Sequence, residues 1–187
     1  MTRTTSVLAG ALTGGMLALA TPAFSQANGG MSLQDTFDYL KTTINITGAV
    51  AWEGFPHDSL NGQDWTYTRR VALSNIRYDL PGCTFWFHYN VVTNGAVSSD
   101  VDGGVPFRDV REIKVSTEAT LVTKRDAQAG HPTYSTRSQP EIYDVVASRA
   151  DGTENVFSFY DMDTANRFAK AAMHAAELCG NTPISDF

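Results

Sequence analysis

The sequence predicts an α+β domain: an N-terminal helix, a bent antiparallel sheet or roll of about six to seven strands, and a C-terminal amphipathic helix packed on that sheet. Two observations predict it. Apolar residues recur at helical spacing in Asp161–Gly180, and several earlier segments alternate apolar and polar residues between turn signals. A small lipocalin-like barrel is the alternative fold.

Residues 1–27 have the pattern of a cleavable signal peptide, with Arg3 before an apolar stretch and small residues at the end. We expect cleavage after Ala27, with Ser25 as the alternative. No cysteine lies near this site, which excludes a lipoprotein anchor, and no Arg-Arg pair indicates twin-arginine export. Residues 28–187 are therefore expected to form a single globular domain that is periplasmic or secreted.

The charge balance argues against two classes of partner. The chain has 14 basic and 20 acidic residues, a net charge of −6. Removal of the signal, with its one Arg, leaves 13 basic residues and a net charge of −7. We therefore expect no nucleic-acid partner and no electrostatic binding to an anionic membrane. No later run is apolar enough to span a bilayer, so stable membrane insertion is not expected.

The N-terminal helix is predicted from Ser32 to about Ile44, because Ser32 and Asp35 resemble a capping box before an apolar stripe. The next segment, Thr47–Asp64, has many glycines and is predicted to be irregular. It contains Trp52 and Phe55 together with His57 and Asp58. These aromatic residues either plug a barrel mouth or line a ligand site.

Trp65–Leu80 is predicted to be a strand whose alternation changes phase at Ser74-Asn75, which indicates a bulge. Leu80–Cys83 has the residues of a type II turn, and a strand follows from Cys83 to Val92. Ser98–Gly104 is predicted to be an acidic loop. It resembles part of a calcium loop at Asp100 and Asp102 but lacks the later ligands, which favours a tight turn.

A long strand is predicted within Val105–Lys124, because Ile113, Val115, Ala119 and Leu121 alternate with polar residues. Arg125–Pro140 is predicted to be a polar loop. Glu141–Ser148 and Asn155–Asp161 flank the turn signal Asp151-Gly152 and are predicted to form a hairpin.

The closing helix has an Ala-rich apolar stripe that includes Phe168 and Cys179. Asp161 or Asp163 is placed to cap its start, and Gly180 is placed just past its end. Cys83 and Cys179 are the only cysteines, and in an exported protein such a pair favours a disulfide. Two separate buried thiols are the alternative.

Three stretches, Ser74–Trp86, Phe157–Asp161 and Ala165–Gly180, resemble small exported bacterial proteins of unknown function. The order of strands followed by a helix also resembles a pleckstrin-homology-like roll, whose last helix covers one open end of a bent sheet. Members of that fold that bind phosphoinositides use a basic loop between early strands. Here the only basic cluster is Arg69-Arg70, so the resemblance does not imply binding of lipid head groups.

No catalytic, metal or cofactor motif is present, and His57, His88, His131 and His174 lie in separate segments. A hydrolase is the third hypothesis, with His88 meeting Asp79 or Asp100. The leading hypothesis is a non-catalytic binding or structural module of the cell envelope, and its partner is an envelope protein or a small molecule. The alternative is a carrier of a small apolar ligand or lipid, with a cavity between sheet and helix. The candidate surface comprises Trp52, Phe55, His57, Asp100 and Asp102.

Overall fold

A computed structural model describes residues 30–58, 62–128, 130 and 134–185 of the chain. The chain divides into two units, residues 1–30 and 31–187, and the fold below is that of the second. The predicted signal peptide, both of its cleavage positions and His131 lie outside the described residues.

The described residues form three helices, one 3-10 turn and twelve strands. In chain order these are α1 (Leu33–Thr47), β1 (Val50–Gly54), β2 (His57–Asp58), β3 (Gln63–Asp64), β4 (Tyr67–Asp79), β5 (Thr84–Thr93), β6 (Ala96–Pro106), η1 (Phe107–Asp109), β7 (Val110–Thr117), α2 (Glu118–Gln128), β8 (Tyr134–Ser135), β9 (Ser138–Gln139), β10 (Tyr143–Arg149), β11 (Glu154–Phe159), α3 (Met162–Leu178) and β12 (Ile184–Ser185).

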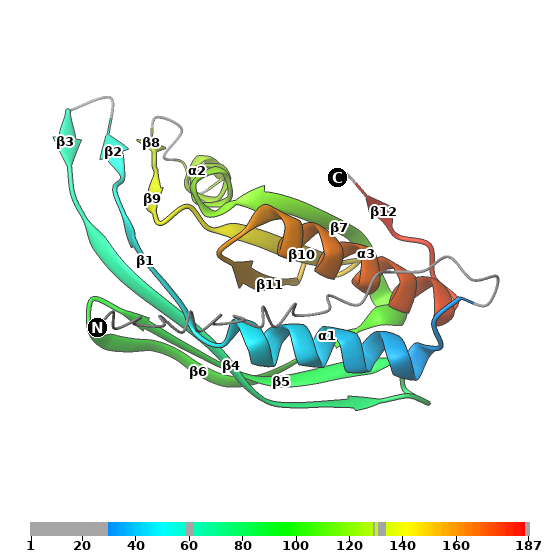
Figure 1. Cartoon of the computed structure of the whole chain (residues 1–187). Helices are drawn as coiled ribbons and strands as arrows, with labels where there is room; N and C mark the ends of the chain where they lie inside the picture. Colours follow the sequence, from blue (N-terminus) through cyan, green and yellow to red (C-terminus); the bar gives the residue numbers. More distant parts are fainter. Residues whose placement is uncertain (1–29, 59–61, 129, 131–133, 186–187) are drawn as a thin grey trace, which may run out of the picture. The chain divides into compact units, whose positions relative to one another are not determined.

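The strands form a five-stranded sheet in the order β6-β5-β4-β1-β9, a four-stranded sheet in the order β11-β10-β7-β12, and a small sheet of β3, β2 and β8 (Figure 1). This confirms the α+β class with helices at both ends of the domain. The strands predicted to form one sheet belong to three separate sheets. None of these sheets closes into a barrel, so the lipocalin-like alternative is wrong.

The two long helices bring the main sheets together. α1 packs on β4 of the five-stranded sheet, α3 packs on β7 and β10 of the four-stranded sheet, and the two helices contact each other (Figure 1). The buried core therefore combines both sheets and both helices. Its largest fully buried side chains include Phe37, Phe85, Phe159, Phe168 and Ile113. No described helix is long and apolar enough to cross a bilayer.

Both predicted helix starts are confirmed. Ser32 accepts a hydrogen bond from the Asp35 amide, and the Asp35 carboxylate accepts one from the Ser32 amide, which completes the capping box. Asp161 accepts from the Thr164 amide at 2.7 Å and so caps α3. Gly180 has φ of 81°, the left-handed conformation usual just past a helix end.

Two strand irregularities follow the sequence signals. The β4–β5 register shifts between Ser74 and Arg77, and Asn75 has φ of 51°, which confirms the bulge. The turn at Leu80–Cys83 is not type II, because Cys83 rather than Gly82 lies in the left-handed region. The Cys83 amide donates to the Leu80 carbonyl at 3.1 Å and closes the turn immediately before β5.

Four other predictions are corrected. Ser98–Gly104 is part of β6 rather than a loop, because backbone pairing along β5 outweighs the turn preference of Asp and Gly. The strand predicted within Val105–Lys124 ends at Thr117, and α2 begins at Glu118. Thr47–Asp64 contains β1, β2 and β3, and Arg125–Pro140 contains the end of α2 together with β8 and β9. Short strands of this kind depend on pairing with distant segments.

The predicted disulfide is confirmed between Cys83 and Cys179, whose Cα atoms are 5.9 Å apart. The bridge joins the turn before β5 to the C-terminal end of α3 across 96 residues of chain. It therefore ties the five-stranded sheet to the helix that packs on the four-stranded one.

Candidate functional site

The candidate site is a cleft of about 330 Å³ between edge strand β6 of one main sheet and edge strand β11 of the other. We call it the inter-sheet cleft. Trp52, Phe87 and Tyr89 supply an aromatic wall, and Glu118 and Arg69 supply polar groups. Its volume lies within the range of small-molecule sites in proteins.

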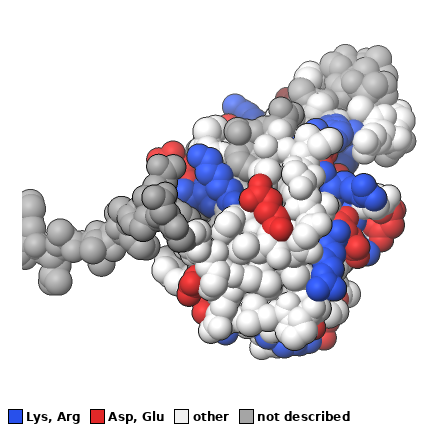
Figure 2. Space-filling model, turned by 90° about the vertical axis from the view of Figure 1, so that its right-hand side faces the viewer, with Lys and Arg blue, Asp and Glu red and all other residues white. Residues whose placement is uncertain are grey.

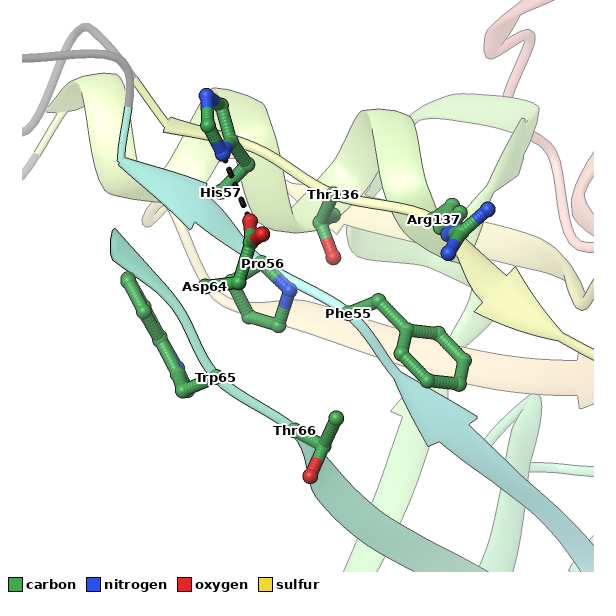
Figure 3. Close-up of a pocket in the computed structure, with 8 residues that line it drawn as sticks. All are labelled: Phe55, Pro56, His57, Asp64, Trp65, Thr66, Thr136 and Arg137. Atoms are coloured by element: carbon green, nitrogen blue, oxygen red, sulfur yellow. Dashed lines mark hydrogen bonds and ion pairs between the residues drawn. The ribbon is translucent and has the colours of Figure 1, made fainter. Parts of the chain in front are cut away.

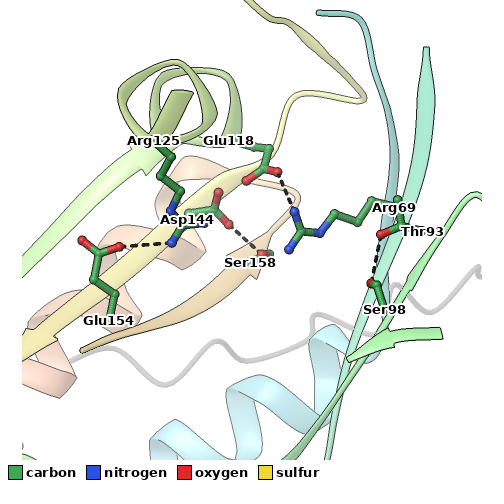
Figure 4. Close-up of polar contacts among 8 residues, drawn as sticks. All are labelled: Arg69, Thr93, Ser98, Glu118, Arg125, Asp144, Glu154 and Ser158. Carbon is green, nitrogen blue, oxygen red and sulfur yellow. Dashed lines mark hydrogen bonds and ion pairs between the residues drawn. The ribbon is translucent and has the colours of Figure 1, made fainter. Parts of the chain in front are cut away.

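One buried carboxyl group, that of Glu118, lines this cleft, and a second, that of Asp144, lies beside Glu118. Glu118 begins α2 and is 4% exposed, and Asp144 on β10 is 0% exposed. Ser158 lies opposite Asp144 in the β10–β11 ladder, and its hydroxyl donates to Asp144 Oδ1 at 2.6 Å (Figure 4). A buried carboxylate is costly unless it is paired. The protonation of Glu118 and Asp144 therefore determines what the cleft can bind.

The pKa of Asp144 is raised to about 8, mainly because burial disfavours the charged form and also because the negative charge of Glu118 lies beside it. Ser158 and Arg125 act in the opposite direction. At neutral pH Asp144 is therefore largely protonated.

Arg69 reaches the same site from β4. Its Nη1 atom lies 3.8 Å from Glu118 Oε1 (Figure 4). Its guanidinium lies over the Trp52 ring, 5.8 Å from the ring centre. Burial raises the pKa values of Tyr67 and Tyr89 beside it. The ion pair between Arg69 and Glu118 is loose, since the two groups are in contact range without a hydrogen bond.

Several polar atoms around the cleft are buried without a hydrogen-bond partner among the described residues. They are Trp52 Nε1, Arg69 Nε, Glu118 Oε1, Asp144 Oδ2 and Asn155 Nδ2. Such atoms are rare in protein interiors, and several of them around one cleft mark it as a place where a bound molecule would supply the missing partners.

Another ion pair lies among the residues that line the cleft. Arg125 Nη2 of α2 donates to Glu154 Oε2 of β11 at 3.1 Å (Figure 4). Both side chains are more exposed than Glu118. This contact joins the start of β11 to α2.

The candidate residues named from the sequence are distributed over three places. Trp52 lines the inter-sheet cleft, whereas Phe55 and His57 line a separate open groove of about 580 Å³ (Figure 3). In that groove His57 Nδ1 lies 2.7 Å from Asp64 Oδ1, and the Arg137 guanidinium lies 5.1 Å from the Phe55 ring centre. The half-exposed His57 side chain and the exposed Asp64 make this groove the more solvated of the two sites.

Asp100 and Asp102 lie on β6, on either side of His88. His88 Nε2 is 2.8 Å from Asp100 Oδ1, and Nδ1 is 3.1 Å from Asp102 Oδ1. Asp102 and then Asp100 raise the pKa of His88, and Asn90 and then His88 lower that of Asp100. The expected contact between His88 and Asp100 is present. Within the described residues, His88 has no hydrogen bond to a hydroxyl or thiol that could act as a nucleophile.

Sequence reasoning missed Arg69, Glu118 and Asp144 as site residues. Position 118 was predicted to lie in the strand within Val105–Lys124, whereas Glu118 is the first residue of a helix. One signal was available: Asp144 is the one charged residue in the run Tyr143–Ala147, which is otherwise apolar or aromatic. A charged residue in such a run is a candidate for a buried functional group.

On the face shown in Figure 2, basic and acidic side chains are interspersed around a wide uncharged area. In the described part of the chain, no group of three or more His, Cys, Asp or Glu residues is arranged to hold a metal ion. Comparisons with protein-family models, with curated proteins and with solved structures find no match to this chain.

Proposed function

We propose that the protein is a non-catalytic, exported binding module that holds one small polar molecule in the inter-sheet cleft. The observation that carries this proposal is the set of buried, unpartnered polar atoms, including Trp52 Nε1 and Glu118 Oε1, around a cleft of about 330 Å³. A ligand with hydrogen-bond donors and acceptors would satisfy them, while its body packs on Phe87 and Tyr89.

The proposed ligand differs from the apolar molecule or lipid expected of a simple carrier. A purely apolar occupant would leave Glu118 Oε1, Arg69 Nε and Trp52 Nε1 desolvated without a hydrogen bond, and each such group costs about 1 to 3 kcal/mol. A polar ligand avoids this cost. The proposed periplasmic or secreted location is supported by the Cys83–Cys179 disulfide, since such bonds persist in oxidising compartments.

A protein in which Trp52 is the only tryptophan would report on cleft occupancy. Trp65 and Trp86 are 41% and 40% exposed, so Phe at both positions should preserve the fold and leave Trp52 as the sole fluorophore. A panel of small amines, alcohols, amides and carboxylates should contain molecules that change its fluorescence in a saturable way. If no member of the panel changes Trp52 emission, the proposed function is wrong.

Two substitutions on one strand provide the matched control. Ser99 lines the cleft, whereas Val97 of the same strand is 63% exposed and does not line it. Ser99→Phe should abolish binding by filling the cleft, and Val97→Phe should leave it unchanged. Equal loss in both variants would point to general damage of β6 instead of occupation of the cleft.

A further inference from the structure

The charged side chains that line the inter-sheet cleft balance one another. The lining contains two carboxylates and two guanidinium groups, which belong to Glu118, Glu154, Arg69 and Arg125. Arg69 lies 3.8 Å from the Glu118 carboxylate. Arg125 lies 3.1 Å from the Glu154 carboxylate. A charged ligand would bring an unmatched charge to Glu118, whose side chain is 5% exposed. Because an unpaired charge in a buried site is costly, the lining favours an uncharged ligand.

Four buried side-chain atoms on the lining residues have no hydrogen-bond partner among the described residues. Three of them are donors: Trp52 Nε1, Arg69 Nε and Asn155 Nδ2. The fourth is an acceptor, Glu118 Oε1, which Arg69 approaches without a hydrogen bond. The matching ligand therefore needs more acceptors than donors, and it needs at least one donor.

Charged head groups match this set poorly. An ammonium group has donors only, so it would leave the three protein donors unpaired and place a positive charge near Arg69. A carboxylate has acceptors only, so it would leave Glu118 Oε1 unpaired and add a second negative charge beside it. Neither ion supplies what all four atoms lack.

Hydroxyl groups match the set better than an amide does. A primary carboxamide has as many donors as lone pairs, whereas a hydroxyl group has one donor for two lone pairs that accept. Several hydroxyl groups on one molecule therefore supply an excess of acceptors together with the donor that Glu118 needs. The carbon frame of such a molecule can pack on Phe87 and Tyr89, and the Ser99 hydroxyl adds a further polar group to the wall.

We propose that the ligand of the inter-sheet cleft is a small, uncharged sugar or polyol. Its hydroxyl groups accept hydrogen bonds from Trp52 Nε1 and Arg69 Nε and donate one to Glu118 Oε1. This inference rests on the proposed binding function and names the chemical class of its ligand.

The test compares sugars with charged derivatives of the same ring. Glucose is compared with glucosamine and glucuronate, and galactose with galactosamine and galacturonate. Ribose, xylose and glycerol extend the neutral set to smaller molecules. Binding to the full chain that carries Trp65→Phe and Trp86→Phe is followed by Trp52 fluorescence and by calorimetry.

At least one neutral sugar or glycerol should bind in a saturable way. The charged derivatives of a sugar that binds should bind at least about tenfold more weakly than the sugar itself. Ser99→Phe should abolish this binding, because Ser99 lines the cleft.

Trp52→Phe tests the contact with the indole, and calorimetry replaces fluorescence for this variant. The substitution keeps an aromatic ring and removes one donor, so the sugar should bind about two- to tenfold more weakly. Nε1 of Trp52 has no partner among the described residues, so its removal leaves no group of the protein unpaired and the variant should fold. Trp86→Phe is the matched control. It removes the same N–H from a side chain that is 40% exposed and does not line the cleft, and it should leave the affinity unchanged.

Three results would overturn the inference. These are charged derivatives that bind as tightly as their parent sugar, a sugar affinity that Trp52→Phe leaves unchanged, and sugar binding that survives Ser99→Phe. If no sugar or polyol binds, but an amide or another panel molecule binds and Ser99→Phe abolishes it, the proposed function stands and only the ligand class is wrong. If no sugar, polyol or panel molecule binds, both proposals fail.

Discussion

Glu118 of α2 and Asp144 of β10 place two carboxyl groups against each other in the interior, and neither is more than 4% exposed. The two residues are brought together by the passage of the chain from β7 into α2 and by the pairing of β10 with β7. Their mutual repulsion is relieved by one proton, by Ser158 and by Arg69. The stability of the protein should therefore depend on pH through this pair.

Asp144→Asn should remove a pH dependence of folding. The pKa of Asp144 is raised to about 8 in the folded state and is near 3.8 in the unfolded chain. Between these two pH values the folded protein therefore keeps a proton on Asp144 that the unfolded chain has lost. Stability should then fall as the pH rises through this window, by at most about 1.4 kcal/mol per pH unit. The variant cannot ionise and should be more stable than the parent at about pH 8 but not at about pH 4. Urea denaturation across this range measures the difference. Asp79→Asn at an exposed site is the control, and parallel curves for parent and Asp144→Asn would contradict the prediction.

The ion pair between Arg69 and Glu118 should show coupling in a double-mutant cycle. Arg69→Met leaves the buried Glu118 carboxylate without its cation, and we expect a loss of about 2 to 3 kcal/mol. This expected loss of stability is smaller than the loss on breaking a fully buried ion pair, because the Arg69 side chain is 30% exposed. In the Glu118→Gln background the same substitution should cost less than about 1 kcal/mol. Arg70→Met, at an exposed position of the same strand, is the control. If the losses of stability are additive, the Arg69 and Glu118 side chains contribute independently of each other.

The elements that were predicted correctly are those whose signals are local. The Ser32 capping box, the Asp161 cap with Gly180, and the bulge at Ser74-Asn75 each require only neighbouring residues. The Cys83–Cys179 bridge followed from the cysteine count and from the predicted export. Such features can be predicted because their stabilising contacts lie within a few residues of sequence.

The elements that were missed depend on distant pairing. β6 carries Asp100, Asp102 and Gly103, which favour turns, yet it pairs with β5 from Ala96 to Pro106 with one register shift beside Ser98. The inter-sheet cleft joins residues as distant as Arg69, Glu118 and Ser158. No spacing rule relates these positions, because their proximity depends on how one sheet lies against the other. The candidate site therefore became visible only with the fold.

The pKa of His88 should fall when either acidic neighbour on β6 is neutralised. Asp102 raises it most and Asp100 next, so Asp102→Asn should lower it more than Asp100→Asn. An NMR titration of the imidazole resonances measures both shifts. Asp151→Asn, in the turn between β10 and β11, is the control and should leave the His88 titration unchanged. An unchanged titration in both β6 variants would show that the two contacts do not persist in solution.

Removal of the Cys83–Cys179 bridge should destabilise the domain by about 4 kcal/mol, since the bond closes a loop of 96 residues and thereby restricts the unfolded chain. Thermal unfolding of a double Ala variant against the oxidised parent measures the loss. Full reduction of the parent should give a similar decrease. If the double variant unfolds at the same temperature as the parent, the bridge makes no net contribution to stability.

A second double variant separates the bridge from the backbone at position 83. Cys83 has φ of 52°, a conformation that glycine adopts readily and that costs an L-residue about 1 to 2 kcal/mol. The pair Cys83→Gly with Cys179→Ala should therefore be more stable than Cys83→Ala with Cys179→Ala by roughly 1 kcal/mol. Both lack the bridge, so the difference reports only on the turn before β5. If the Ala pair proves the more stable, the left-handed conformation at position 83 exists only while the disulfide holds it.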